Sequence, residues 1–346
     1  MKIKDFYGIY STGTDVRRMQ IEFFSRRNIL NTKKEIKRNL NKIQIKKKDL
    51  RNKNILNIGS GREALGFLQF KPKKIYHYDV SPFNVKRFKN FLKKKRHLSK
   101  IIKSELLDLS KDELPRDCFD FIYLHGVIQH VDDVGKALKN LILSMRLNGK
   151  MWFYFYRPGA LNTFLGSLQR ELIKGIKIKK FFKFLKINYN NNFVDRIMDD
   201  TYVPNRQLFY PDTYNKNLKR NSIMNFGNTY LKNYNHKVDF LNYHESVVFF
   251  LKKKKKLLNI RINGLNKNNQ ENVLKKNLYK DKKFRDFKEI IDLFYRIKSK
   301  KNIDIFDIVT KLEKIKIEVV NIFYRKKKLD KKQLYKFTKA IKKILS

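Results

Sequence analysis

Cysteine is almost absent from this 346-residue chain, in which Cys118 is the only one. A single thiol cannot form a disulfide within the chain, and it excludes a zinc site built from several cysteines. Cysteine-poor chains are typical of reducing compartments. The sequence therefore predicts a cytoplasmic protein without a metal site.

Long apolar runs are also missing. The longest ones, such as Met151–Tyr156 and Val247–Leu251, are far shorter than the roughly 20 residues that a membrane-spanning helix needs. The first residues lack the apolar stretch of a secretory signal. We therefore expect a soluble protein that has no membrane partner.

Acidic residues are few, with 32 Asp and Glu against 81 Lys and Arg, which gives a formal net charge of +49. Such a charge favours a polyanionic partner such as RNA. The excess is spread over both residues 1–250 and residues 251–346, whereas a nucleic-acid footprint should gather on one face. Most of the cations are lysines in a chain also rich in Ile, Asn, Phe and Tyr. A compositional bias of the genome therefore explains the charge better, and RNA is the second interpretation.

What the chain does contain is a regular alternation of short apolar strands and helices after residue 54. Strands are predicted at Ile55–Ile58, Lys74–Asp79, Ile101–Leu107, Phe119–Leu124 and Met151–Tyr156, and helices at Arg62–Phe70, Pro82 to about Arg96 and Val134–Met145. This alternation implies right-handed crossovers and a parallel sheet covered on both faces. Two later runs, around Thr229–Phe240 and Ser246–Leu251, suit antiparallel edge strands. The predicted fold is therefore α/β and Rossmann-like, with a seven-stranded, mostly parallel sheet.

Three segments are predicted along the chain. Residues 1–54 form an N-terminal helical segment and a candidate cover for the active site. Residues 55–256 form the α/β domain, with a helical lid insert at about 158–222. The lysine run at 252–256 marks a boundary before a basic helical appendage at 257–346. Its three predicted helices are Val273–Ile297, Ile305–Phe323 and Leu334–Leu345.

The strongest local motif is ILNIGSGREALG, which begins at Ile55. A buried strand ends there in a loop with Gly59 and Gly61, and a helix follows at once. Glycines permit a tight turn and let a ligand approach the backbone. Asp79 ends the next strand, where a carboxylate can accept both hydroxyls of a ribose. The same pattern also fits the fingerprint of a nicotinamide dinucleotide enzyme.

The segment SELLDLSKDELPRDCFDFIYLHGVIQHVDDVGKALKNLILSMRLNGKMWFYFY, residues 104–156, separates these two classes. It resembles the central stretch of class I S-adenosylmethionine-dependent methyltransferases. That family has an acidic residue after strand three, Phe-Asp before strand four, an apolar strand that ends near a His, a helix, a turn and strand five. The resemblance covers residues 50–160 well and residues 160–255 only loosely.

The resemblance implies roles for the residues at the first two strand ends. Gly59, Ser60 and Gly61 would contact the amino-acid end of S-adenosylmethionine. Asp79 would hold the ribose, and Val80 would pack on the adenine. As an alternative, Asp79 would cap the following helix.

The resemblance also assigns residues after the third and fourth strands. Asp108 and Leu109 would lie beside the adenine amino group, with a turn as the alternative for Asp108. His125 would face the methyl-bearing sulfonium, or would be a structural histidine. The chain departs from the family pattern at Asn57, where an acidic residue is usual, and at Glu63, where a third glycine is usual.

The acceptor is expected beyond the carboxyl ends of the strands, near Gln129 and Arg157, with His125, Tyr156 and Asp200 as candidate catalytic residues. The carboxylate pair that ends at Asp200 fits a base or an acceptor contact, and it fits an exposed turn before a proline equally well.

Four functions are consistent with these features. The first is methylation of a small polar metabolite or sugar-like molecule, because the long insert after strand five can enclose a pocket. The second is RNA methylation. The others are a non-enzymatic scaffold that has lost cofactor binding and a nicotinamide-dependent oxidoreductase.

Overall fold

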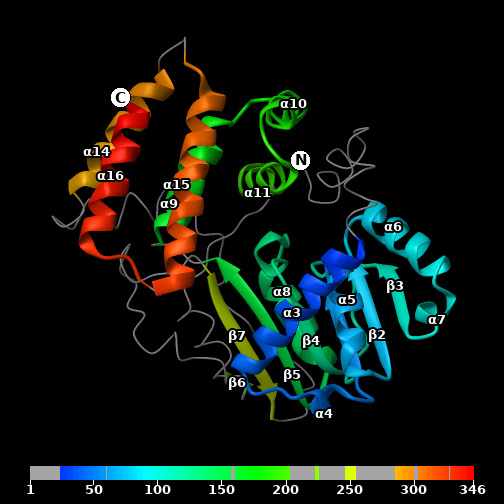
Figure 1. The fold of residues 1–346 in the computed structure, drawn as a ribbon. Helices are drawn as coiled ribbons and strands as arrows, with labels where there is room; N and C mark the ends of the chain where they lie inside the picture. Colours follow the sequence, from blue (N-terminus) through cyan, green and yellow to red (C-terminus); the bar gives the residue numbers. More distant parts are fainter. Residues whose placement is uncertain are drawn as a thin grey trace.

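A computed structural model of the protein describes residues 24–59, 61–156, 160–202, 223–225, 246–254, 285–299, 303–326 and 328–346. A β-sheet flanked by helices occupies the lower part of Figure 1, and a group of helices stands above it. Within these ranges, no helix is both long and apolar enough to cross a bilayer.

The sheet has the strand order β3-β2-β1-β4-β5-β7-β6. The strands are β1 (Asn54–Ile58), β2 (Lys74–Asp79), β3 (Ile102–Leu106), β4 (Phe119–Leu124), β5 (Met145–Tyr156), β6 (Ile223–Asn225) and β7 (Ser246–Lys253). The pairs formed among β1 to β5 are parallel, whereas β7 runs antiparallel to both β5 and β6. This arrangement confirms the Rossmann-like α/β class. The predicted strand at Thr229–Phe240 lies outside the described residues.

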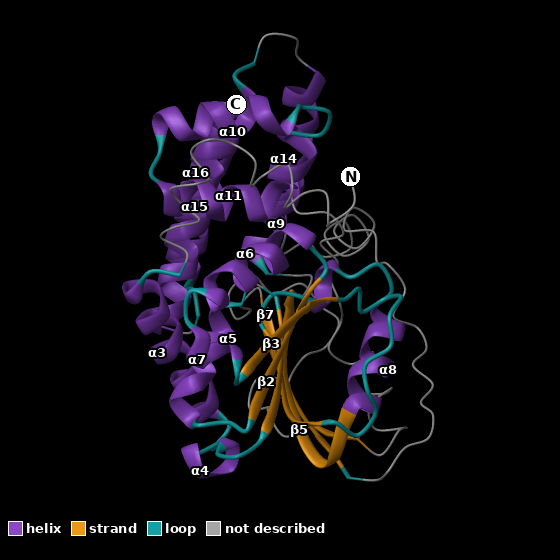
Figure 2. Cartoon of the chain, turned by 90° about the vertical axis from the view of Figure 1, so that its right-hand side faces the viewer, coloured by secondary structure: helices purple, strands orange, loops and turns teal. Residues whose placement is uncertain are grey.

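Helices cover both faces of the sheet (Figure 2). One face carries α3 (Arg26–Lys42), α4 (Lys47–Leu50), α5 (Arg62–Phe67), η1 (Leu68–Phe70), α6 (Pro82–Lys93) and α7 (Arg96–Ser99). The other carries α8 (Val134–Ser144), which follows the short helix η2 (Ile128–His130). All five residues of β1 are buried, including Asn54 and Asn57, as expected for a central strand of a parallel sheet covered on both faces.

The N-terminal helix α3 belongs to the sheet domain. Ile36 and Leu40 are buried in the same core as α5 and the sheet. A Cβ atom at Gly66 of α5 would lie 2.6 Å from the Cδ1 atom of Ile36, so the absence of a side chain at Gly66 lets the two helices approach closely.

Strand β5 begins six residues earlier than the sequence predicts, at Met145. Phe119 pairs with Met145 but Phe121 pairs with Lys150, so the expected turn is a bulge inside the strand. Asn148 has a φ of 63°, the left-handed conformation that an Asn-Gly pair favours. The residues that favour a turn are thus present, but in the structure they form a bulge within β5.

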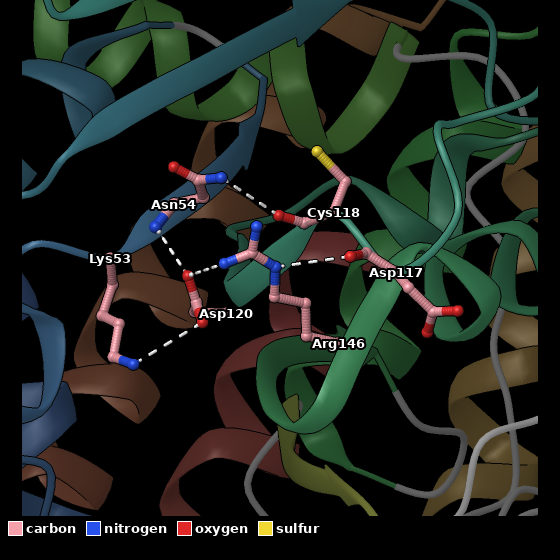
Figure 3. Close-up of polar contacts among 6 residues, drawn as sticks. All are labelled: Lys53, Asn54, Asp117, Cys118, Asp120 and Arg146. Carbon is pink, nitrogen blue, oxygen red and sulfur yellow. Dashed lines mark hydrogen bonds and ion pairs between the residues drawn. The ribbon is translucent and has the colours of Figure 1, made fainter.

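A network of polar contacts joins the amino ends of β1, β4 and β5 (Figure 3). The Asp120 carboxylate accepts the Asn54 backbone N–H at 2.8 Å and an Arg146 guanidinium N–H at 3.2 Å. The Lys53 ammonium lies 3.7 Å from the same carboxylate. These contacts fix the order of three strands at the edge where the parallel strands begin.

Lys253 of β7 completes this edge although its side chain is fully buried. Its ammonium donates to the Asp117 carboxylate at 2.7 Å and to the carbonyls of Met145 at 2.6 Å and Leu143 at 3.4 Å. A buried charge needs such partners, because its transfer out of water is costly.

The remaining helices form one body, which we call the helical body. It consists of α9 (Leu161–Leu172), α10 (Ile178–Asn188), α11 (Asn191–Tyr202), α14 (Arg285–Ser299), α15 (Ile305–Lys326) and α16 (Lys331–Leu345). These helices share one hydrophobic core. Gln169 of α9 donates to the Val309 carbonyl at 3.1 Å and to the Glu313 carboxylate at 3.0 Å, both on α15. Helices expected in a lid insert and helices expected in a separate appendage thus pack together.

Candidate active site

The candidate site lies at the carboxyl edge of the sheet, where β1 to β5 end below the helical body (Figure 1). Gly59, Leu107 and His125 follow the ends of β1, β3 and β4, and Asp79 and Tyr156 are the last residues of β2 and β5. From β1 the strands are added outward to β2 and β3, whereas from β4 they are added in the opposite direction to β5, so the strand order reverses between β1 and β4. Open α/β sheets bind their ligands at this switch point.

Two glycines shape the loop after β1. Gly59 has a φ of 125° and Gly61 a φ of 87°, conformations that L side chains rarely adopt. A Cβ atom at Gly61 would lie 3.0 Å from the Phe88 ring. The loop therefore requires glycine at both positions. Ser60, expected to bind the cofactor, lies outside the described residues.

His77 of β2 is hydrogen-bonded to this loop. Its Nε2–H donates to the Gly59 carbonyl at 2.6 Å, so its Nδ1 accepts from the Ser104 hydroxyl at 2.8 Å. Burial lowers the pKa of His77 to about 4, which keeps the ring neutral. His77 was not among the predicted site residues. Its only sequence signal is the two-residue spacing from Asp79, which places both side chains on one face of β2.

Asp79 is buried at the end of β2. Its Oδ1 accepts the Ser81 backbone N–H at 2.7 Å and its Oδ2 accepts the Asn84 side-chain N–H at 3.1 Å. Burial raises the pKa of Asp79 to about 7, against the lowering effect of these hydrogen bonds. The cap of α6 is Ser81, not Asp79. Because a carboxylate offers about four acceptor positions, Asp79 retains capacity for a ligand.

Arg87 of α6 adds a positive charge beside Asp79. Its guanidinium donates to the Asn84 side-chain oxygen at 3.2 Å and lies over the rings of Phe24 and Phe83, at 5.6 and 5.7 Å from their centroids. Burial lowers the pKa of Arg87 to about 10. At neutral pH it is still a cation and favours the ionised form of Asp79.

The other expected adenine contacts have mixed surroundings. Val80 is partly exposed directly after Asp79. The Asp108 carboxylate accepts the Ser110 backbone N–H at 3.0 Å and pairs with the Lys111 ammonium at 2.6 Å, so it shapes its own turn. The Leu109 side chain is buried in the core between the sheet and α8.

His125 lies just beyond β4 and contacts the N-terminal helix. Its Nε2 is 3.3 Å from the Glu35 carboxylate of α3, and its ring is parallel to that of Trp152, with centroids 5.9 Å apart. Burial lowers the pKa of His125, but the hydrogen bond to Glu35 and nearby carboxylates outweigh it, so the pKa is raised overall. Glu35 was not foreseen, because nothing in its sequence neighbourhood points to a histidine on another element.

The two other candidate catalytic residues are less closely defined. Tyr156 is partly exposed at the end of β5 and pairs with Ser246 of β7. Asp200 falls in the last turn of α11, in the helical body, and its side chain lies outside the described residues. Arg157 lies outside them as well. The structure thus brings His125 and Tyr156 to neighbouring strand ends.

Comparison with known proteins identifies the core of this sheet. Residues 56–153 match the family model described as "Methyltransferase domain". No curated protein sequence matches the chain.

Several solved structures are similar in fold. The YcgJ protein from Bacillus subtilis is 16% identical, with a TM-score of 0.37 over 54% of this chain and 70% of that one. An S-adenosylmethionine-dependent methyltransferase from Mesorhizobium loti is 21% identical, with a TM-score of 0.28 over 33% of this chain and 52% of that one. Phosphoethanolamine N-methyltransferase 2 from Haemonchus contortus, in complex with S-adenosyl-L-methionine, is 14% identical, with a TM-score of 0.42 over 65% of this chain and 46% of that one. The chain thus spans about half the length of the last two.

The chain therefore carries a class I S-adenosylmethionine-dependent methyltransferase domain, as the sequence resemblance predicted. Domains of this class are enzymes, and their cofactor is S-adenosylmethionine.

Proposed function

We propose that this protein transfers a methyl group from S-adenosylmethionine to a small polar or sugar-like acceptor. The observation that carries the proposal is the arrangement of the carboxyl edge. The glycine loop and Asp79 lie at the ends of β1 and β2, α3 reaches the same edge through Glu35, and the helical body stands above it. An edge of the sheet that is covered by α3 and by the helical body suits an enclosed small-molecule site.

The residues present fit the cofactor. The glycine loop after β1, with positive φ angles at Gly59 and Gly61, suits the amino-acid end of the cofactor, and the spare acceptor positions of the buried Asp79 suit the ribose hydroxyls. We assign Val80, Asp108 and Leu109 to the adenine side of the same edge. The bound cofactor supplies a methyl group that is already activated on a sulfonium.

The protein's part is to hold the acceptor in line and to exclude water. A hydroxyl or ammonium acceptor must also lose a proton, for which His125 is the proposed base, with Tyr156 and Asp200 as further candidates. The Nε2 atom of His125 lies 3.3 Å from the Glu35 carboxylate. Glu35 would stabilise the imidazolium that then forms.

Calorimetric titration with S-adenosylhomocysteine tests the cofactor site. We expect micromolar binding by the wild-type protein and its loss in Asp79→Ala. Asp307→Ala, which removes an exposed carboxylate paired with Lys311 on α15, is the matched control and should bind normally. Absence of binding by the wild type would refute the proposed function.

RNA methylation is the second candidate, and one observation favours it. On α16, the exposed lysines recur at helical spacing on one face, at Lys332, Lys336, Lys339 and Lys343. Such a stripe can neutralise several phosphates. Tritium from methyl-labelled S-adenosylmethionine that appears in RNA, with binding that weakens steeply with salt, would favour RNA over the small acceptor.

A further inference from the structure

Two buried amide side chains have no hydrogen-bond partner. The Gln129 side chain is 0% exposed and that of Asn162 is 2% exposed. Neither the oxygen nor the nitrogen of either amide makes a hydrogen bond. Within the described part of the chain, these are the only two side chains in which both amide atoms are buried and unpaired.

Both amides lie at the edge of the sheet that holds the candidate site. Gln129 is on η2, a few residues beyond β4 and His125. Asn162 is in the first turn of α9, which follows β5. Since β4 and β5 are neighbours in the sheet and η2 packs against β5, the two amides belong to adjacent strand ends.

Buried amides without partners are costly, and native proteins rarely retain them without a reason. The other buried amide side chains of the described residues each make at least one hydrogen bond, although the oxygens of Asn57 and Gln169 are also unpaired. Gln169, which is also 0% exposed, gives its amide nitrogen to both the Val309 carbonyl and the Glu313 carboxylate. Gln129 and Asn162, which lack any partner and lie beside the proposed cofactor site, are therefore candidates for pairing with a ligand.

We propose that Gln129 and Asn162 bind the methyl acceptor through its uncharged hydroxyl groups; this assignment rests on the proposed function. Each amide offers a donor and an acceptor and carries no charge. A hydroxyl group both donates and accepts, so it can satisfy both halves of an amide. An ammonium group only donates and a phosphate group only accepts, so each would leave half of the unpaired atoms unsatisfied. The pairing capacity of the two amides therefore favours hydroxyl groups over an ammonium or a phosphate group at this position.

The first test measures thermal stability. Gln129→Met and Asn162→Leu replace each amide with an apolar side chain of similar shape. Because no hydrogen bond is lost, the melting temperature should stay the same or rise. Gln169→Met removes real hydrogen bonds and should lower it. If the melting temperature falls in Gln129→Met or Asn162→Leu by as much as in this control, the amides have structural partners. That result would overturn the proposal.

The second test measures transfer of tritium from methyl-labelled S-adenosylmethionine to the fraction below 1 kDa of an extract from cells that express the protein. We expect labelled products that neither a cation- nor an anion-exchange resin retains. Each amide variant should reduce this labelling about tenfold at low extract concentration, and Gln169→Met should not. Labelled products that are retained by either resin, or undiminished labelling by the variants, would overturn the proposal.

Binding of S-adenosylhomocysteine separates failure of this proposal from failure of the proposed function. Both amide variants should bind it with the affinity of the wild type. If the wild type does not bind it, the proposed function fails. If the wild type binds it but labels no small molecule, the cofactor site stands and the assignment of the two amides fails.

Discussion

The two edges of the central sheet differ in how completely their polar groups are paired. At the amino edge, the charges of Asp120, Arg146 and Lys253 all have partners within 3.2 Å. At the carboxyl edge, Asp79 is buried with acceptor positions to spare, and Gln129 and Asn162 have no partner. Both edges belong to the same strands, so the difference does not arise from the fold itself.

This contrast distinguishes groups that stabilise the fold from groups reserved for a ligand. A buried charge that is fully paired has no capacity left for a ligand. The loss of one of its partners lowers the stability of the folded protein. A buried group with spare capacity gains a partner only when a ligand binds. Substitutions at the amino edge should therefore change stability alone, and those at the carboxyl edge should change binding as well.

The largest effect is expected for Asp117→Ala at the amino edge. The fully buried Lys253 ammonium would keep two carbonyl contacts but lose its carboxylate partner. We expect the free energy of unfolding to fall by about 3–5 kcal/mol, measured by urea denaturation. The affinity for S-adenosylhomocysteine should be unchanged at a temperature where the variant is folded, and a large loss of affinity would contradict the separation of the two edges.

His77→Phe should affect both stability and binding. It leaves the Gly59 carbonyl and the buried Ser104 hydroxyl without their partner, at a cost of about 2 kcal/mol in the free energy of unfolding. Because Gly59 belongs to the loop proposed to hold the cofactor, the affinity for S-adenosylhomocysteine should fall about tenfold. Thermal melting and calorimetry measure the two effects. A loss of stability with unchanged affinity would show that the loop keeps its shape without His77.

The affinity for S-adenosylhomocysteine should rise with pH. Because the pKa of Asp79 is about 7, its carboxyl group is largely neutral at pH 6 and largely ionised at pH 8. The ionised form accepts ribose hydroxyls better, so the affinity should increase about tenfold between these pH values. Asp79→Asn should bind more weakly and without this dependence. An equal rise in that variant would assign the titration to another group.

The smallest effect is expected for Glu35→Gln. Loss of the charge next to Nε2 should lower the pKa of His125, which an NMR titration of the ring can measure. The raised pKa of His125 contributes stability below the ordinary value of 6.5, and this contribution disappears as the pH rises through the pKa of the folded protein. Both side chains are partly exposed, so the change in the free energy of unfolding should be below about 1 kcal/mol. An unchanged His125 pKa would contradict the pairing.

Much of the fold and of the proposed cofactor site could be predicted from the sequence. The pattern of apolar residues predicted the bounds of β2 and β4, and it predicted those of β7 to within two residues. Gly59, Gly61 and Asp79 were recognisable because their spacing follows directly from a strand, a turn and the next strand. The contacts of His125 with Glu35 and of His77 with Gly59 join separate elements. Local patterns carry no information about such pairs.

The helical body shows the same limit on a larger scale. The apolar stripe of α15 correctly predicted a helix that buries one side. A stripe shows that a helix has a partner, but not which one. The sequence therefore could not show that α15 packs against α9, which lies on the other side of a long stretch of chain.

The place of β7 in the sheet has a consequence for the order in which the protein is made. Residues 150–156 of β5 pair with residues 252–246 of β7, so the whole segment 157–245 must be synthesised before that edge is covered. Until then the apolar run Met151–Tyr156 presents an unpaired strand edge to the cell. Such edges are prone to aggregation. A ribosome that stalls between β5 and β7 should therefore carry a nascent chain in need of a chaperone.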